Sequence, residues 1–331
     1  MKDGKEFESL VGRQFVPNFN IVAEIRRSIA EIQATRNHYV LCYVANVVRG
    51  NGMNNAIDNS DDLPFNEMVN SVPQDVNEVD VVLVTPGGLG NQVNNFVNAL
   101  RPRFEKVNFI LLNMAMSAGT IFIMSGDEII MSKQSKFGPI DSQIQNKDGR
   151  FVPAQSILLA LEDIKKRGEQ KLKNHMQPDW IDVQLLRTID LRDIGMAQSA
   201  SKYSTDMVKD FLVKYKFRSW KKHFSTGNDV TEEEKKKRAD DIANLLCNHS
   251  LWKSHGHAIN RDVAWLTCKL KITHSESIEG LDRAMRRMWA LYYWLFENTP
   301  MVKMFISNDY CIIRSAALNV PVQMPAKTRK K

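Results

Sequence analysis

The stretch "NMAMSAGTIFIMSGDEIIM" (113–131) decides the fold, because a single serine stands there between a strand-like run and a helix-like run. A second unusual turn, "LVTPGGLG" (83–90), precedes it by about one βα unit. Both turns follow runs that are dense in Val, Ile and Leu on consecutive positions, which is typical of strands buried on both faces. In open α/β sheets, ligands bind beyond the carboxyl ends of such strands. The two turns therefore indicate a site at one edge of a parallel sheet.

The sequence around these turns predicts an α/β domain. Val93, Phe96 and Leu100 recur at helical spacing between two strand-like runs, and Pro102 closes the segment. The order β-α-β-α-β with short connections predicts a parallel sheet with helices on its faces and right-handed crossovers. The strand-like runs lie at 38–48, 80–85, 107–112 and 127–132.

The second half of the chain lacks the strand-like runs of the first half and instead carries amphipathic helical patterns. The aromatic block at 285–306 is interpreted either as a buried helix or as a surface for self-association. We divide the chain into four parts: an N-terminal segment at 1–37, a core at 38–180, a helical extension at 181–290 and a C-terminal tail at 291–331.

Composition excludes several classes of protein. The 331 residues are 43% hydrophobic and 25% charged, as in globular proteins, and no apolar run reaches the roughly 18–20 residues that span a bilayer. The first residues are too charged for a secretory signal, so we expect a cytoplasmic protein. The four cysteines are far apart and form neither a zinc signature nor a disulfide framework. Without an HExxH or a GxGxxG after a strand, we expect no metal and no organic cofactor.

The net charge of +7 is modest, and part of it lies in the terminal "KTRKK" (327–331). The segment "SHGHAINRDVAWLTCKL" (254–270) resembles a helix-turn-helix. Its second helix presents Val263, Ala264, Trp265 and Leu266, whereas recognition helices present several polar residues to the groove. We expect this helix to pack in the core, and we expect no nucleic-acid partner.

The two turns together can support catalysis. Ser117 opens a helix, where backbone N–H groups lack intrahelical partners and the helix dipole is positive. The Gly87-Gly88 pair frees the backbone, so that an N–H can point outward. The N–H groups of Gly88 and Ala118 can then form an oxyanion hole, in which one donor is worth on the order of 10²–10³ in rate. Taken singly, Ser117 is an ordinary N-cap and Pro-Gly-Gly an ordinary turn; their joint position favours a site.

Five motifs in this order and spacing resemble the serine dehydrogenase proteinase family, which belongs to the broader Clp-protease/crotonase fold together with signal peptide peptidase A. The close match covers about residues 80–165, and a weaker similarity lies at "LWKSHGHAI" (251–259), with its W-x-x-H segment. The resemblance implies a Ser117 nucleophile and oxyanion donors at Gly88 and Ala118. The five motifs are "TPGGL" (85–89), "AMSAGT" (115–120), "DEIIM" (127–131), "FGPID" (137–141) and "PAQSIL" (153–158).

The general base departs from both known patterns. Clp proteases use a histidine that follows the serine, but here Asp141 stands in the corresponding segment. Signal peptide peptidases use a lysine, which this chain lacks at the aligned "VPAQSIL". His255 is one candidate base, since imidazole titrates near neutrality, and Asp141 is a candidate to orient it. Lys165 or Lys166 is the alternative, at the cost of depressing a lysine pKa by burial. A structural histidine and a turn aspartate remain the ordinary interpretations.

The sequence therefore predicts a serine hydrolase that cleaves peptide bonds in a peptide or protein through an acyl-enzyme on Ser117. A catalytically silent scaffold or interaction protein with the same fold is one alternative. An acyl-CoA-handling crotonase relative is another, because the same oxyanion hole polarises a thioester carbonyl. The resemblance also implies a homo-oligomer, since active sites of this superfamily are commonly enclosed by rings or stacked trimers.

Overall fold

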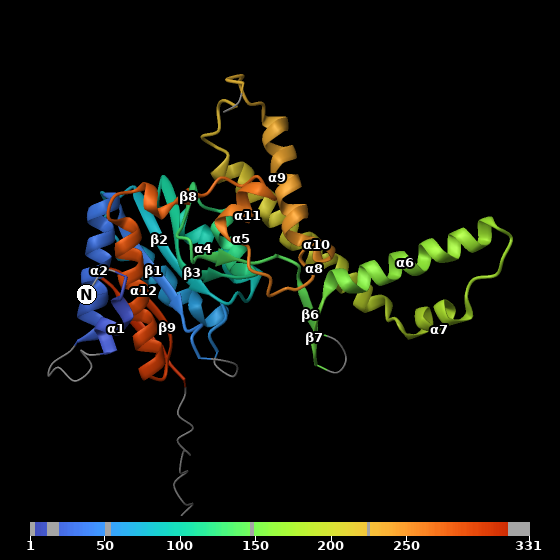
Figure 1. Cartoon of the computed structure of the whole chain (residues 1–331), viewed down its shortest axis with the longest axis horizontal. Coiled ribbons are helices and arrows are strands. Elements are labelled where there is room, and N and C mark those ends of the chain that lie inside the picture. The colour runs from blue at the N-terminus through green and yellow to red at the C-terminus, as the bar shows by residue number, and fades with distance from the viewer. Residues whose placement is uncertain (1–3, 12–19, 50–53, 146–148, 224–225, 317–331) are drawn as a thin grey trace, which may run out of the picture.

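A central sheet organises the protein (Figure 1). The computed structural model describes residues 4–11, 20–49, 54–145, 149–223 and 226–316. The strands run in the order β10-β9-β1-β2-β3-β4-β8, and β5 pairs with β3. All the pairings among β1 to β5 and β8 are parallel, whereas β9 lies antiparallel to β1 and to β10. The strand bounds are β1 (Tyr39–Ala45), β2 (Glu78–Thr85), β3 (Lys106–Ala115), β4 (Glu128–Met131), β5 (Lys136–Phe137), β8 (Thr273–His274), β9 (Met301–Ile306) and β10 (Cys311–Ser315).

The parallel strands are buried on both faces, as their unbroken apolar sequences predict. In β1, Leu41 and Tyr43 face one core while Cys42 and Val44 face the other. β1 and β2 pair in register from Tyr39–Val79 onward. The predicted α/β fold with a mostly parallel sheet is thus confirmed.

Helices cover both faces of the sheet, which makes three layers (Figure 1). One face carries α1 (Glu6–Val11), α2 (Ile21–Arg36) and α12 (Leu281–Asn298). The other face carries α3 (Asp62–Asn70), α4 (Gly90–Leu100), α5 (Ala118–Met124), α8 (Leu191–Phe211), the π-helix η2 (Leu212–Lys216) and α9 (Glu232–Cys247). Short elements also lie on this side: η1 (Asn59–Asp61), α10 (His249–Trp252) and α11 (Arg261–Leu266). In contrast, η3 (Ser275–Ser277) precedes α12, and its Ser275 hydroxyl donates to Asp282 in the first turn of that helix.

An arm projects from the layered body (Figure 1). It begins with the hairpin of β6 (Gln143–Gln145) and β7 (Phe151–Pro153) and continues through α6 (Ala154–Lys173) and α7 (Trp180–Thr188). Large apolar side chains on the arm are exposed, among them Leu172, Trp180 and Ile181. The arm therefore leaves apolar surface uncovered in a single chain.

In the last part of the chain, the structure contradicts the predicted tail and favours the buried-helix interpretation of the aromatic block. Residues 301–315 do not form a tail; they supply β9 and β10, which extend the sheet beside β1. The aromatic block belongs mainly to α12, whose Met288, Tyr292 and Phe296 are buried against the sheet. Antiparallel strands that join a sheet from the far end of the chain leave no local signal of their partner. In the part of the chain that the structure describes, no helix is both long and apolar enough to cross a membrane.

Candidate active site

The glycine turn after β2 lies directly against the serine turn after β3. Gly87 adopts φ = 108°, a conformation that favours glycine. A Cβ on Gly87 would lie 2.8 Å from Ser117 Cβ and 2.8 Å from the Met116 carbonyl oxygen. The Met116 N–H also donates to the Thr85 carbonyl at 3.1 Å. The two turns are thus in contact, as neighbouring parallel strands predict.

Gly88 is fixed by the segment that precedes η1. Its φ is 143°, and a Cβ there would lie 2.2 Å from the Ile57 carbonyl oxygen. The Ile57 N–H donates to the Gly87 carbonyl at 2.7 Å, and the Leu89 N–H donates to the Ile57 carbonyl at 2.9 Å. Only glycine fits this close backbone approach, so the direction of the Gly88 N–H is set by two flanking hydrogen bonds.

Ser117 has a strained backbone and an uncommitted hydroxyl. Its φ of 50° and ψ of −115° lie outside the regions that non-glycine residues favour. Such strain costs on the order of 1–3 kcal/mol and tends to accumulate at functional sites. Ser117 occupies the N-cap position of α5, yet its side chain makes no capping hydrogen bond. The interpretation of Ser117 as an ordinary N-cap therefore fails.

The start of α5 offers backbone donors next to this hydroxyl. Ala118 is the first residue of α5, and the following N–H groups donate within the turn, Gly119 to Met116 and Thr120 to Ser117. Within the described residues, neither the Ala118 nor the Gly88 N–H donates to a protein acceptor. Both N–H groups are therefore available to an external hydrogen-bond acceptor.

Asp141 is fully buried and binds two imidazoles. Its Oδ1 accepts from His255 Nδ1 at 2.7 Å, and its Oδ2 accepts from His249 Nδ1 at 2.9 Å. Because a carboxylate only accepts hydrogen bonds, we assign the protons to Nδ1 of both rings. Nε2 of His255 is then an acceptor, and this side chain is 29% exposed. The arrangement suits a base that is oriented by a carboxylate.

The histidine loop is hydrogen-bonded to the segment beside α5. Phe137 and Ile259 exchange backbone hydrogen bonds at 3.0 and 2.8 Å. Gly138 donates to the Thr120 hydroxyl at 3.1 Å, and Thr120 belongs to α5. A Cβ on Gly138 would meet Met116 Cε at 2.6 Å. The loop that carries His255 is thereby connected to the residue that precedes Ser117, although no hydrogen bond joins the Ser117 hydroxyl to His255 among the described residues.

The lysine candidates lie elsewhere. Lys165 and Lys166 are exposed on α6, in the arm, where they pair loosely with Glu169 and Glu162 at 3.9 and 3.8 Å. Their surroundings match a solvated helix face and do not favour either as the base.

Sequence reasoning missed the second imidazole on Asp141. His249 opens α10, a helix capped by the Asn248 side chain, and lies six residues before His255. The one available signal was the presence of three histidines within 249–257. The structure also separates their contacts, since the His257 ring lies against Trp252, tilted by 40° with ring centroids 5.1 Å apart.

A buried ionic cluster supports the oxyanion turn and was also missed. Lys303, on β9, is 1% exposed and donates to both Asp61 oxygens at 2.9 and 2.8 Å, and to Asp58 at 3.2 Å. The Tyr43 hydroxyl donates to Asp61 at 2.9 Å; burial, with the nearby carboxylates, raises the Tyr43 pKa well above its usual value and keeps it a donor. Because Asp58 follows Ile57, this cluster anchors the segment that holds Gly88.

The described residues contain no cluster of three or more His, Cys, Asp or Glu side chains that is arranged to hold a metal ion.

The strand order and the two contacting turns define a ClpP-like α/β protein. The chain belongs to the ClpP-like SDH-type serine proteinase family, whose sequence profile matches residues 21–231. It is also similar to two uncharacterized proteins of Methanocaldococcus jannaschii: MJ1495, with 37% identity over 98 residues, and MJ0137, with 33% identity over 94 residues. These matches cover 30% and 28% of this chain and 30% and 31% of the two relatives, so the chain spans about a third of their length.

Proposed function

We propose that this chain is a serine peptidase that uses Ser117 as its nucleophile, with His255 as the general base and Asp141 as the residue that orients it. One observation carries the proposal: the buried Asp141 holds His255 at 2.7 Å, in a loop hydrogen-bonded next to the strained Ser117 turn. A strained, uncapped serine beside two free backbone donors supplies the rest of the required chemistry.

The proposed reaction follows from these groups. The Ser117 oxygen attacks the scissile carbonyl carbon while its proton passes to His255 Nε2. Negative charge develops on the carbonyl oxygen, which accepts hydrogen bonds from the Gly88 and Ala118 N–H groups. Collapse breaks the C–N bond, and the imidazolium returns the proton to the departing amine. Water, deprotonated by the same imidazole, then hydrolyses the acyl-enzyme and regenerates the Ser117 hydroxyl.

The two imidazoles on Asp141 have different proposed roles. The His255 loop contacts Gly138, since the His257 carbonyl oxygen lies 3.6 Å from the position of a Gly138 Cβ. His249 lies on α10, and the adjoining Leu246 carbonyl accepts from the Ile140 N–H at 3.0 Å. His249 is therefore a positioning residue, which fixes the second oxygen of Asp141.

Hydrolysis of a mixed-sequence fluorogenic peptide library by the full chain tests the proposal. We expect cleavage by the wild type, none by Ser117→Ala, and wild-type cleavage by Ser199→Ala. Ser199 is a matched control because it is an exposed serine on α8, outside the loop that carries His255. Cleavage that persists in Ser117→Ala, or its absence from the assembled wild type, would contradict the proposal.

A catalytically silent scaffold is the second candidate, and one observation favours it. The Ser117 hydroxyl and His255 are not hydrogen-bonded to each other within the described residues. Catalytic hydrogen bonds are often long in substrate-free enzymes and tighten when substrate binds, so this geometry does not exclude catalysis. The library assay separates the two functions.

We further propose that the chain self-associates through its arm. Trp180 is 72% exposed on α7, and Ile181 and Leu185 beside it are also exposed. Exposed apolar patches of this kind mark association surfaces. Aspartate at Ile181 should therefore shift the molecular mass in light scattering from an oligomer to a single chain, whereas aspartate at the exposed Leu63 on α3 should leave it unchanged. A wild type that is monomeric at micromolar concentration would contradict this proposal.

A further inference from the structure

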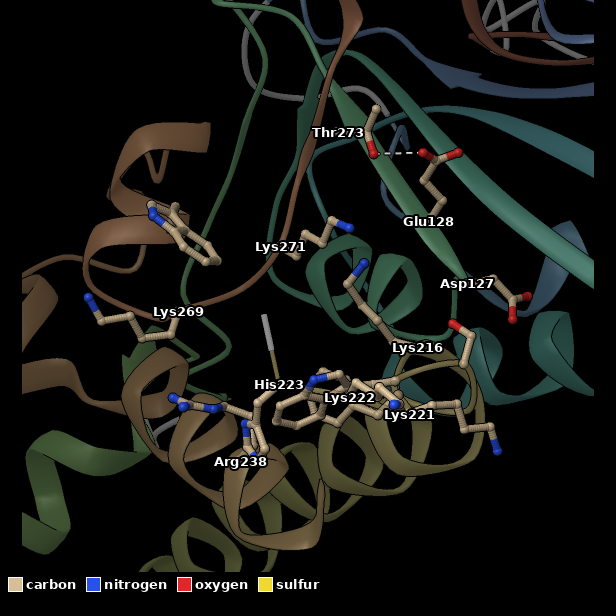
Figure 2. Close-up of a pocket in the computed structure, with 14 residues that line it drawn as sticks. Asp127, Glu128, Lys216, Lys221, Lys222, His223, Arg238, Lys269, Lys271 and Thr273 are labelled. Carbon is tan, nitrogen blue, oxygen red and sulfur yellow. Dashed lines mark hydrogen bonds between the residues drawn. The ribbon is translucent and has the colours of Figure 1, made fainter. Parts of the chain in front are cut away.

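A basic pocket lies at the opposite edge of the sheet from Ser117 (Figure 2). Asn108 of β3 pairs with Glu128 at the start of β4, so the pocket beside Glu128 is at the amino ends of these strands. Ser117 follows the carboxyl end of β3. The pocket has a volume of about 1040 Å³, at the upper end of the roughly 300–1,000 Å³ typical of small-molecule sites. It is thus a separate cavity with room for a ligand.

The positive charge of the pocket is not neutralised by the protein. The two acidic residues of its wall are already paired: Asp127 with Arg101 at 2.6 Å and with Arg218 at 2.8 Å, and Glu128 with Arg36 at 2.7 Å. Across the described chain, none of the six cations that line the pocket forms an ion pair. These cations are Lys216, Lys221, Lys222, Arg238, Lys269 and Lys271.

Two of these lysines face each other across the pocket. Lys216 ends the π-helix η2 and Lys271 precedes β8, and their ammonium groups point toward one another (Figure 2). Burial, reinforced by the charge of Lys271 and opposed by Glu128 and Asp127, lowers the Lys216 pKa to about 8. Like charges brought together in this way are disfavoured unless an anion lies between them. The two like charges are thus brought together without an ion pair to either lysine among the described residues.

Aromatic surface flanks the cations. Trp265 on α11 is 55% exposed, although the sequence predicted that it packs in the core. On the short helix α11, Ala264 is fully buried, whereas the next residue, Trp265, lies on the side of the helix that lines the pocket. Trp220, on another wall, packs edge-on against Phe217 with centroids 5.4 Å apart. Planar ligands stack on indoles of this kind beside cationic side chains.

We propose that this pocket binds a nucleoside polyphosphate, whose phosphates lie between Lys216 and Lys271 and whose base stacks on Trp265. Several phosphate charges are needed to match six uncompensated cations, and an exposed indole suits an aromatic base. The walls come from several elements, η2, α9 and α11 among them, and form a concave site of limited volume, which favours a small molecule over a nucleic-acid strand. The inference concerns binding alone and does not depend on peptidase activity.

Calorimetric titration of the full chain with ATP tests the proposal. We expect saturable binding that Lys216→Gln with Lys271→Gln weakens on the order of a hundredfold, about tenfold for each lost charged contact. The matched control, Lys165→Gln with Lys166→Gln, removes the same charge from exposed positions on α6 and should leave affinity unchanged. Absence of saturable binding, or equal weakening in both double variants, would overturn the site.

Ligand fragments test the nucleotide part of the inference. Inorganic triphosphate should bind more weakly than ATP, and Trp265→Ala should lower ATP affinity toward that of triphosphate. Leu266→Ala is the control, because Leu266 is an exposed apolar side chain on the same helix that is not among the residues lining the pocket. Triphosphate that binds as tightly as ATP would overturn the role of the base. Tighter binding of a single-stranded oligothymidylate in the same pocket would overturn the choice of a small nucleotide.

Discussion

The two edges of the sheet use charged groups in opposite ways. At the carboxyl edge, Asp141 is buried with both oxygens occupied by imidazoles, and Lys303 lies between Asp58 and Asp61. At the amino edge, Lys216 and Lys271 face each other and form no ion pair in the described part of the chain, although the charges of Asp127 and Glu128 act on Lys216. The buried charged side chains named at the carboxyl edge thus have partners within the protein, whereas the two lysines at the amino edge have no ion-pair partner among the described residues.

This difference separates two kinds of site. Catalysis requires groups held in place before substrate binds, so its charges are matched internally. Binding of a polyanion gains most when the protein has not already neutralised its own cations. Substitutions at the first edge should therefore change rates and stability, and substitutions at the second should change ligand affinity and its salt dependence.

The largest expected effect at the carboxyl edge of the sheet comes from Asp141→Asn. The amide both removes the charge that stabilises the imidazolium and offers a donor where His255 also donates. In a comparable triad, this change lowers turnover about 10⁴-fold. Peptide hydrolysis by Asp141→Asn should fall by this order, while the neighbouring exposed His257→Gln should hydrolyse at nearly the wild-type rate. Equal rates for the two variants would mean that Asp141 has no catalytic role.

A smaller effect, on stability, is expected from Lys303→Met. Removing one partner of a buried ion pair leaves an uncompensated charge and costs about 3–5 kcal/mol in the free energy of unfolding. The control is Lys106→Met, whose ion pair with Glu78 is exposed to solvent and should contribute little to stability, because solvent screens surface pairs. Chemical denaturation of the two variants measures the difference. A similar loss of unfolding free energy in both variants would show that the cluster of Lys303, Asp58 and Asp61 stabilises the protein no more than an exposed ion pair does.

The smallest expected effect concerns pH at the basic pocket. The Lys216 pKa is lowered to about 8, so Lys216 loses its proton as the pH rises through about 8. Lys271, Asp127 and Glu128 face it, and a bound polyphosphate favours its protonated form. ATP affinity should thus decline between pH 7 and pH 9 by a factor of up to about ten, and this decline should vanish in Lys216→Gln. A pH profile identical in both proteins would remove Lys216 from the site.

The sequence predicted the central architecture because its signals are local. Buried strands are recognisable as apolar runs in the sequence. The stretches 83–90 and 113–131 carry Gly87, Gly88 and Ser117 at the positions where the backbone has a positive φ. The family assignment that these motifs suggested is confirmed by the match over residues 21–231. The proximity of Gly87 to Ser117 follows from two adjacent parallel strands and was likewise foreseeable.

The remaining features depend on contacts between segments that are distant along the chain. His249 meets Asp141 only after α9 and α10 fold onto the 137–141 segment. β9 and β10 join the sheet beside β1. The sequence around Lys303, in the middle of β9, does not predict that this lysine is buried against Asp61. The lysines that line the basic pocket come from segments before and after α9, so no single run of charged residues in the sequence predicts the pocket.

The rate of labelling by a fluorophosphonate tests the central claim most directly, because the probe reports activation of the serine and needs no knowledge of the substrate. Mass spectrometry of the wild type should show one adduct, on Ser117. Labelling should slow on the order of 10²–10⁴-fold in His255→Gln and less than about tenfold in His249→Gln. Wild-type labelling by a folded His255→Gln protein, or an adduct on another residue, would contradict the assignment of Ser117 and His255.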